Sequence, residues 1–257
     1  SLLSSGNLVV SGLGATFWVD TVNPGQSFAN ISIFDEGSLH GGSEVNFTNS
    51  ATISSGTLTG EIGGSGLLVK TGNGSALVAG NLTHSGGTTI ESGTLKIGTA
   101  TTGSISGDVA VLQNGTIEFN RGNADSNSGT FSGTGAITKV GNGTLTFDGE
   151  SSGFEGATTI SAGTLQIGSG GATGSLGGAI TANAGTALVY NTSANVVLGA
   201  LSGNGSLVQA GNGSLIVSAN QTAFNGATRI QSGTLQIGNG GASGSLAGNI
   251  TNNGTLV

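Results

Sequence analysis

The sequence predicts an all-β chain built as a parallel β-solenoid, a coil in which the short strands of successive turns stack on one another. Three observations favour this fold class: alternating strand patterns, an internal repeat with a period of about 70 residues, and a composition of 52 Gly in 257 residues with only 7% charged residues. Inward positions of such a coil cannot hold unpaired charge, and outward positions need only Thr, Ser, Asn and Gln. We expect a single domain of about eleven turns of roughly 23 residues.

The strand patterns are short and are bounded by Gly or Asn. In the segment GTLQIG, Leu235 and Ile237 point inward, whereas Thr234 and Gln236 point outward. The segments GTLTFDG, GSLIVSA and NGTIEFN follow the same alternation. A period of two is typical of half-buried strands, and no long apolar stripe of helical period is present. Each buried aliphatic side chain contributes roughly 1.5–3 kcal/mol, so stacked turns stabilise one another where a single turn cannot fold.

The repeat extends well beyond one strand. The nonapeptides IESGTLKIG, ISAGTLQIG and IQSGTLQIG begin at Ile90, Ile160 and Ile230, which are evenly spaced along the chain. Since a fixed interval between near-identical segments is the mark of a repeat architecture, each interval is read as one structural unit.

A smaller period divides each unit. The Gly that opens a Gly-Thr/Ser-apolar strand recurs three times, at Gly143, Gly163 and Gly185, before the next unit begins at Gly213. Three turns therefore fill one unit. Turns of this size favour a solenoid over a propeller, whose blades need about 40–45 residues. The longest interval of the unit, from Gly185 to Gly213, is expected to bulge as a loop from one face.

Glycine also marks the expected corners of the coil. Asn–Gly pairs such as Asn142–Gly143 and Asn212–Gly213 recur through the chain. These pairs suit corners that require a positive φ angle, which Gly adopts without steric cost.

Residues 1–50 differ from the repeats of residues 51–257. They contain the only Trp, the only Pro and four of the nine Phe residues: Trp18, Pro24, Phe17, Phe28, Phe34 and Phe47. A terminal turn must cover an open apolar end, so these residues are consistent with irregular N-terminal turns or a cap. The functional alternative is an aromatic binding patch that includes Trp18.

Composition and charge exclude several classes of function. The net charge is −7, and the five basic residues are scattered singly, which argues against nucleic-acid binding. No run of 18 apolar residues predicts a transmembrane helix. The absence of Cys excludes disulfides, Cys-ligated zinc and thiol catalysis. We interpret the chain, which begins at Ser1 and contains no Met, as a mature or excised fragment.

Three segments, residues 64–98, 133–168 and 203–238, share a longer pattern. It reads Gly-x-Leu-x-Lys-x-Gly-x-Gly-x-Leu, then aromatic-x-Gly-x-Thr-x-Ile, then Ser-Gly-Thr-Leu-x-Ile-Gly. This pattern resembles the autotransporter-associated β-strand repeat of passenger domains in type V secretion. The resemblance implies a right-handed parallel β-helix, export through the periplasm and outer membrane to the surface of a Gram-negative cell, and a C-terminal outer-membrane barrel that is absent from this chain.

The three copies differ at two positions of the shared pattern. The residues at these positions are Lys70, Lys139 and Gln209 at the first, and His84, Phe154 and Phe224 at the second. We expect these differences to affect one corner and not the fold. Because His84 occupies an aromatic position, we expect it to pack as a ring.

The only local cluster of carboxylates is formed by Asp148, Glu150 and Glu155. Paired carboxylates can flank a glycosidic bond or bind Ca²⁺. However, the matching positions of the third copy carry no carboxylate, and no sugar-binding aromatic platform accompanies them. We interpret the cluster as part of a solvated loop and, together with Trp18, as a set of possible interaction residues.

One segment matches a catalytic motif by its letters alone. GESSG, residues 149–153, fits the nucleophile elbow with Ser151 at its centre, but an elbow requires a following helix and a His partner. The chain contains two His residues, His40, which we expect in a surface loop, and His84. We therefore expect no catalytic residues, no metal and no cofactor, and predict that the protein is not an enzyme.

Together these observations predict a surface-displayed or secreted autotransporter passenger that acts as an adhesin or self-association module. Its partner would be a host-cell receptor, a matrix protein or a second copy of the chain, and not nucleic acid. Two alternatives stay open: a secreted virulence effector passenger that binds a host-cell receptor, and a polysaccharide-active enzyme built on a β-helix.

Overall fold

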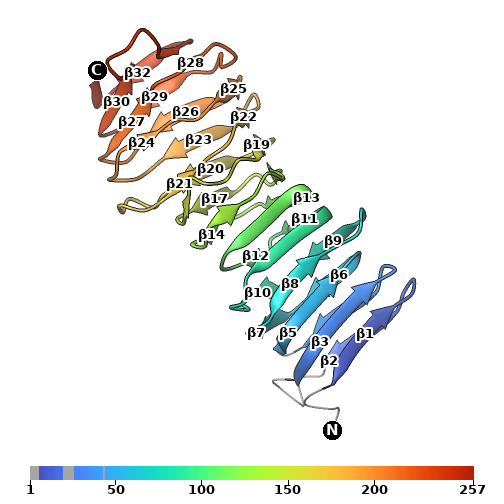
Figure 1. The fold of residues 1–257 in the computed structure, drawn as a ribbon. Helices are drawn as coiled ribbons and strands as arrows, with labels where there is room; N and C mark the ends of the chain where they lie inside the picture. The colour runs from blue at the N-terminus through green and yellow to red at the C-terminus, as the bar shows by residue number, and fades with distance from the viewer. Residues whose placement is uncertain (1–5, 20–25, 43) are drawn as a thin grey trace. The chain divides into compact units, whose positions relative to one another are not determined.

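The computed structural model describes residues 6–19, 26–42 and 44–257, and every regular element among them is a β-strand. The prediction of a right-handed parallel β-solenoid is confirmed, with about 12 turns in the described residues. Contacts divide the chain into two compact units, residues 1–121 (unit 1) and 122–257 (unit 2), and Figure 1 shows the strands of each unit stacked turn upon turn. The described residues contain no helix that is long and apolar enough to span a membrane.

The strands of unit 1 are β1 (Asn7–Ser11), β2 (Thr16–Val19), β3 (Gln26–Phe34), β4 (Ser38–Gly41), β5 (Val45–Ile53), β6 (Gly56–Thr59), β7 (Glu61–Gly64), β8 (Leu67–Lys70), β9 (Ser75–Val78), β10 (Asn81–Leu82), β11 (Thr88–Ala100), β12 (Ser104–Ile105) and β13 (Val109–Arg121). They form three faces. One face stacks β2, β4, β6 and β9, and a second stacks β1 on the later part of β3. The third face includes β7, β10 and β12. The long strands β3, β5, β11 and β13 bend around corners and contribute to two faces each.

The strands of unit 2 are β14 (Asp125–Asn127), β15 (Phe131–Ser132), β16 (Ala136–Lys139), β17 (Thr144–Phe147), β18 (Glu150–Ser151), β19 (Ala157–Ile160), β20 (Thr164–Ile167), β21 (Ser175–Leu176), β22 (Ile180–Ala182), β23 (Ala187–Tyr190), β24 (Val196–Val197), β25 (Leu201–Gly203), β26 (Ser206–Gln209), β27 (Ser214–Val217), β28 (Asn220–Gln221), β29 (Thr228–Ile230), β30 (Thr234–Ile237), β31 (Ser245–Leu246), β32 (Ile250–Asn252) and β33 (Thr255–Leu256). Seven of them, β14, β17, β20, β23, β26, β29 and β32, form one continuous parallel sheet along the unit.

The register in unit 2 shows that one repeat of the sequence is longer than three turns. Lys139 pairs with Ile160, and Ile160 pairs with Ala182. Ala182 pairs with Gly203, so three turns are complete before the chain reaches Gln209, which matches Lys139 in the third copy. The third copy therefore begins one face later than the second. Shorter turns explain why the structure contains about 12 turns where the sequence indicates eleven.

The longest interval between the opening Gly residues does not form a bulging loop, which corrects that expectation. Ala187 of β23 pairs with Ser206 of β26, so this turn is shorter than the average of roughly 23 residues expected from the sequence. β27, which opens at Ser214, begins the next face. The interval between Gly185 and Gly213 is thus one ordinary turn followed by one extra face.

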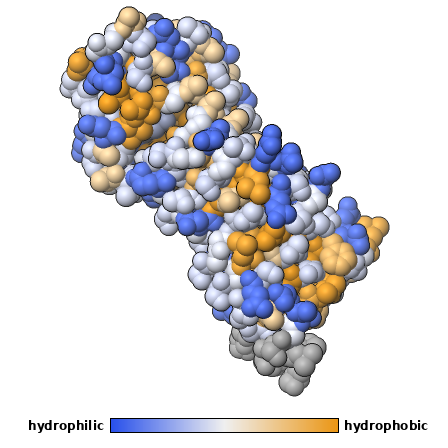
Figure 2. Space-filling view, in the orientation of Figure 1, coloured by the Kyte–Doolittle hydropathy of each residue, from blue (hydrophilic) through white to orange (hydrophobic). Residues whose placement is uncertain are grey.

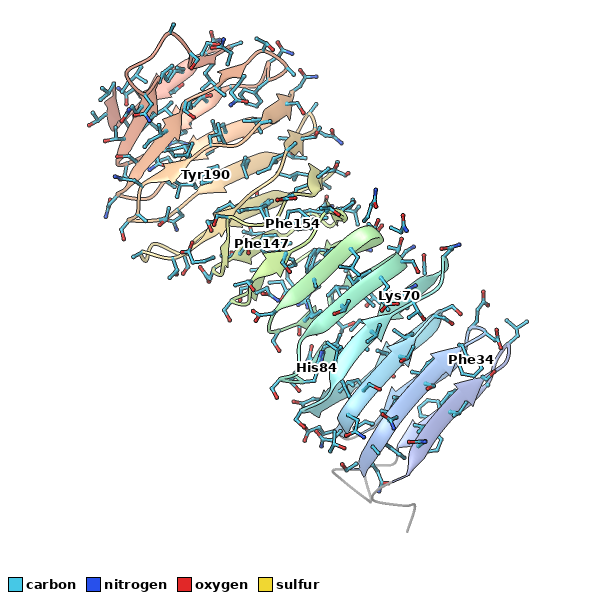
Figure 3. The ribbon with its side chains drawn as sticks, in the orientation of Figure 1. Phe34, Lys70, His84, Phe147, Phe154 and Tyr190 are labelled. Atoms are coloured by element: carbon cyan, nitrogen blue, oxygen red, sulfur yellow. The ribbon has the colours of Figure 1, made fainter. Side chains whose placement is uncertain are left out.

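Alternation along each strand places aliphatic and aromatic side chains in the core of each unit. In the four-residue strands β17, β20, β23 and β26, the second and fourth residues are buried. Paired strands align these buried positions, so each inward side chain packs on the inward side chains of the neighbouring turns. Figure 3 shows Phe147, Phe154 and Tyr190 among the side chains of unit 2.

Glycine serves two different needs in the corners. Gly163 and Gly233, which open the repeated Gly-Thr-Leu strands, have φ angles of +69° and +63°. Gly143 and Gly213, from the Asn–Gly pairs, are not among the described residues with positive φ, so that expectation was wrong for them. A Cβ atom on Gly143 would instead overlap the carbonyl oxygen of Asn123 in the preceding turn. These pairs are required for close approach of the backbones of two turns.

The described part of residues 1–50 takes part in the same parallel stacking. Phe28 of β3 pairs with Phe47 of β5, and both side chains are buried. Phe17 of β2 packs edge-on against Phe28 with ring centroids 6.1 Å apart, whereas Phe34 is 37% exposed. Pro24 lies outside the described residues. A separate N-terminal cap over residues 1–50 stays a prediction.

Candidate functional site

The predicted carboxylate cluster lies around β18. Glu150 is exposed, and its carboxylate accepts hydrogen bonds from the Gly174 N–H at 3.1 Å and the Ser175 hydroxyl at 2.8 Å. In the third copy the Asn220 side chain accepts in the same way from the Gly244 N–H at 3.0 Å. The side chain at this position therefore fastens the loop that leads into the strand of the next turn, and either Glu or Asn can do so.

The other two carboxylates of the cluster have different surroundings. Asp148 is half-buried, and its Oδ1 is buried without a hydrogen-bond partner. Glu155 is exposed, and its backbone N–H donates to the Gly133 carbonyl oxygen at 2.9 Å. Within the described residues, no three His, Asp or Glu side chains gather as metal ligands would. A role for these residues in binding a partner stays a prediction.

Trp18 lies on the outer side of β2 and is 70% exposed. Its ring stacks on His40 of the next turn, with centroids 4.4 Å apart and an interplanar angle of 16°. The Nδ1 atom of His40 lies 2.8 Å from the hydroxyl of Thr59, one turn further on. His40 is thus part of strand β4 and not of a loop, which corrects that expectation. The three side chains form an outward column, with Trp18 as its most exposed apolar member.

Ser151, the centre of the elbow-like segment, is 1% exposed and lies within strand β18. Its hydroxyl oxygen accepts a hydrogen bond from the Phe131 backbone N–H at 2.8 Å. In the third copy, Gln221 accepts from the Leu201 N–H at 2.7 Å in the same manner. Ser151 therefore joins two turns and is not presented as a nucleophile.

His84 packs in the core of unit 1, as expected from its aromatic position in the repeat. It is 1% exposed, and its ring centroid lies 5.3 Å from that of Phe47. Its Nε2 lies 2.9 Å from the carbonyl oxygen of Gly87 and 3.2 Å from the hydroxyl of Thr88. Burial lowers the pKa of His84, against a smaller opposing effect of the bond to Gly87. The ring is therefore held neutral as a packing element.

Two lysines have a structural role that their place in the sequence repeat did not lead us to predict. Lys70, labelled in Figure 3, is fully buried, and its Nζ donates to the carbonyl oxygens of Thr71, Gly72 and Ser92 at 2.5, 2.9 and 3.1 Å. Lys139 is 1% exposed and donates to two carbonyl oxygens. Burial lowers the pKa of both lysines.

Gln209 occupies the equivalent place in the third copy and donates to the carbonyl oxygens of Gly211 and Gly213 at 2.9 and 3.0 Å. The position thus requires a buried donor that caps a corner of carbonyl groups, and it accepts either an ammonium or an amide. The signal was present in the sequence, because Lys70 and Lys139 follow Leu68 and Ile137 by two positions and so share their inward side.

Each unit also has a shallow groove on its surface. In unit 2 a groove of about 370 Å³ lies between strands β21 and β24, which we call the β21–β24 groove. Its lining includes Glu150, Leu176, Asn195, Val196 and Val197. It is the place where the exposed side chain of Glu150 meets apolar side chains of the next two turns.

The groove of unit 1, of about 630 Å³, is more polar. Gly41, Gly60 and Gly80 line it, and the charged residues along it include Glu61 and Arg121. In the view of Figure 2, apolar patches interrupt a largely polar or neutral surface in both units.

Comparison with known proteins agrees with this geometry. The model of the passenger-associated-transport-repeat family matches residues 68–97, 137–167 and 207–237. The chain is 34% identical over 300 residues to the adhesin BmaC autotransporter of Brucella suis biovar 1. That alignment covers 98% of this chain but only 8% of the relative, and no solved structure gave a significant match. Three passenger-associated-transport repeats stacked in a parallel β-solenoid support the interpretation of the chain as a repeat domain of an autotransporter passenger.

Proposed function

We propose that this chain belongs to the exposed passenger of a Gram-negative autotransporter and acts there as an adhesive, non-catalytic surface. The observation that carries the proposal is the similarity over 98% of the chain to a protein named as an adhesin. Because the chain corresponds to only 8% of that relative, the proposal concerns this segment and not the activity of the whole relative.

The outer surface of the coil supports adhesion by polar contacts. In unit 1, Asn30 donates from Nδ2 to the Asn7 side-chain oxygen at 2.8 Å, and Ser50 donates to the Asn30 side-chain oxygen at 3.1 Å. In unit 2, the hydroxyls of Thr181 and Ser202 lie 2.9 Å apart in successive turns. Such ladders hold polar side chains in fixed rows, which reduces the entropy lost when a partner binds.

The residues with the strongest catalytic patterns support a role without catalysis. Ser151 and His84 are both buried, and each makes hydrogen bonds within the stack. Glu150, the carboxylate on which a polysaccharide-active enzyme would depend, fastens a loop. The effector alternative has no specific residue in its favour.

The test is adhesion by the chain itself. Beads carrying residues 1–257 are incubated with cultured host cells, with immobilised matrix proteins and with beads of the same kind, and a heat-unfolded preparation is the control. The proposal expects saturable attachment to cells, matrix or other beads that is lost on unfolding. No attachment to any of the three would contradict it, and a response of host cells to the soluble chain without attachment of beads would favour the effector.

A further inference from the structure

In unit 2 the parallel ladder is interrupted between β21 and β24. β21 pairs with β18 in a two-stranded sheet, and β24 pairs with β27 in a separate four-stranded sheet. The strands β21 and β24 belong to the same face in successive turns, where consecutive strands would normally lie about 4.8 Å from each other and hydrogen-bond. The β21–β24 groove of about 370 Å³ takes the place of that missing pairing.

Hydrogen bonds between two loops border one end of the groove. The Gly170 N–H donates to the Asn191 carbonyl oxygen, and the Ser193 N–H donates to the Gly171 carbonyl oxygen, both at 2.7 Å. The Thr192 hydroxyl also donates to the Gly171 carbonyl oxygen, at 3.1 Å. These bonds fix the segment before β24 to the loop before β21. At the other end, the Ile180 N–H donates to the Ala200 carbonyl oxygen at 2.8 Å, so the groove lies between two bonded parts of the same pair of turns.

The β21 side of the groove has an exposed strand edge. In a parallel ladder, successive residues direct their N–H and C=O groups to opposite neighbours. The Ser175 N–H donates to the Gly149 carbonyl oxygen at 3.1 Å, and the Gly177 N–H donates to the Ser151 carbonyl oxygen at 2.9 Å. The backbone groups of Leu176, between them, consequently point away from β18 and toward the groove.

The β24 side of the groove has a second strand edge, which faces the first. The Leu198 N–H donates to the Ile216 carbonyl oxygen at 2.8 Å, so Leu198 directs its backbone to the following turn. By the same alternation, the backbone groups of Val197 point toward the groove. Edges of this kind are templates for pairing with another extended chain.

The side chains around the groove select the class of ligand. Val197 is 57% exposed, Val196 is half-buried, and Glu150 is the only charged residue among the described residues of the lining. The lining contains no aromatic ring, and so it lacks the stacking platform typical of a sugar site. Aliphatic walls, backbone edges and one carboxylate together match a polypeptide better than a saccharide.

We propose that the β21–β24 groove binds an extended polypeptide segment, which adds to the sheet at Leu176 or Val197 by main-chain hydrogen bonds. The segment directs an aliphatic side chain against Val197 and a basic side chain toward Glu150. The β24 side of the groove runs from Ala194 to Gly199, which is about 20 Å at the usual rise of roughly 3.3 Å per residue. The bound polypeptide segment is therefore short. The role of this groove as the adhesive contact of the chain rests on the function proposed above.

The test uses a displayed library of random linear heptapeptides, selected on the chain and again on two variants. Val197→Arg fills the groove and repels basic side chains. Val9→Arg is the matched control, because Val9 is 59% exposed but lies on β1 in unit 1. The expected result is a set of peptides with alternating aliphatic and basic residues, whose affinity falls at least tenfold with Val197→Arg and is unchanged with Val9→Arg.

Two further measurements separate the mechanism from general stickiness. Methylating one alternate set of backbone nitrogens of an enriched peptide should remove binding and methylating the other set should not, because an added strand directs only alternate N–H groups to the sheet edge. Glu150→Gln retains a side-chain acceptor for the loop and should weaken only peptides with a basic residue. Failure to enrich any peptide that depends on Val197 would overturn the proposal, as would displacement of the peptide by maltohexaose.

The bead assay distinguishes this proposal from the adhesive function on which it rests. Beads carrying the Val197→Arg chain should lose attachment if the groove is the adhesive contact. Undiminished attachment would refute the groove as that contact and leave the adhesive function standing. Absence of attachment by the unaltered chain, with peptide binding retained, would refute the adhesive function alone.

Discussion

Replacing Gln209 by Met tests how much the buried corner donor stabilises the solenoid. Gln209 is 1% exposed and donates to the carbonyl oxygens of Gly211 and Gly213 at 2.9 and 3.0 Å. Each oxygen also accepts a second hydrogen bond, from the Ser232 hydroxyl or the Thr234 N–H. The variant therefore removes two bonds without leaving either oxygen unsatisfied. At roughly 0.5–1.5 kcal/mol per bond, we expect a loss of about 1–3 kcal/mol in the free energy of unfolding.

Replacing Gln209 by Lys introduces the side chain of the other two copies and should make stability depend on pH. Burial lowers the pKa of Lys70 and Lys139 in the folded chain, and we expect the same for a lysine at position 209. Lysine in an unfolded chain has a pKa of about 10.4. Between the lowered pKa of the folded chain and that value, the unfolded chain therefore binds more protons than the folded chain. Stability should rise as the pH increases toward about 10.4, by at most about 1.4 kcal/mol per pH unit for one proton.

Urea unfolding followed by circular dichroism measures both effects between pH 7 and pH 9.5. Hydrogen exchange of residues 206–217 shows whether the change is local to the corner. The reasoning is refuted if Gln209→Met is as stable as the unaltered chain. It is also refuted if Gln209→Lys shows the same pH dependence as the chain with Gln209.

Three further substitutions probe other parts of the stack. His84→Phe should remove an acid-sensitive component of stability. Because burial lowers the pKa of His84, the stability that its neutral ring contributes above about pH 6.5 is lost as the pH falls. Urea midpoints of both proteins at pH 5 and 7.5 measure this loss. Ser151→Ala should cost about 1 kcal/mol at pH 7, because its hydroxyl no longer accepts a backbone bond between turns. Gly80→Ala should cost roughly 1–3 kcal/mol, because its Cβ would overlap the Gly60 carbonyl oxygen, whereas Gly153→Ala, with no atom within 4 Å of its Cβ, is the neutral control; thermal melts compare them.

The fold class could be predicted because it depends on local rules that repeat. Alternation within a strand such as Thr234–Ile237 reports which side is buried, and the recurring Gly residues report corners. The position of each copy around the coil could not be predicted in this way. The sequence between Gly185 and Gly213 is compatible with one long turn and with one ordinary turn followed by an extra face. Only the pairing of β23 with β26 distinguishes these two structures.

The candidate site could be predicted less well, for a physical reason. Ser151 and Glu150 belong to chemically suggestive patterns, but the structure uses both to join turns. The β21–β24 groove has no motif, because it arises from a pairing that is absent between β21 and β24. A missing hydrogen bond between residues a full turn apart leaves no mark on either local sequence.

The displacement of the third copy by one face is the feature of the fold that the sequence repeat alone does not predict. The chain contains no Cys, so a pair of introduced cysteines reports one contact without interference. Val189 pairs with Val208 in the structure, whereas a repeat of three turns would place Val189 beside Ile216. The most direct measurement is disulfide formation under mild oxidation in two double variants. The account predicts rapid bonding in Val189→Cys/Val208→Cys and none in Val189→Cys/Ile216→Cys, and the reverse result would contradict it.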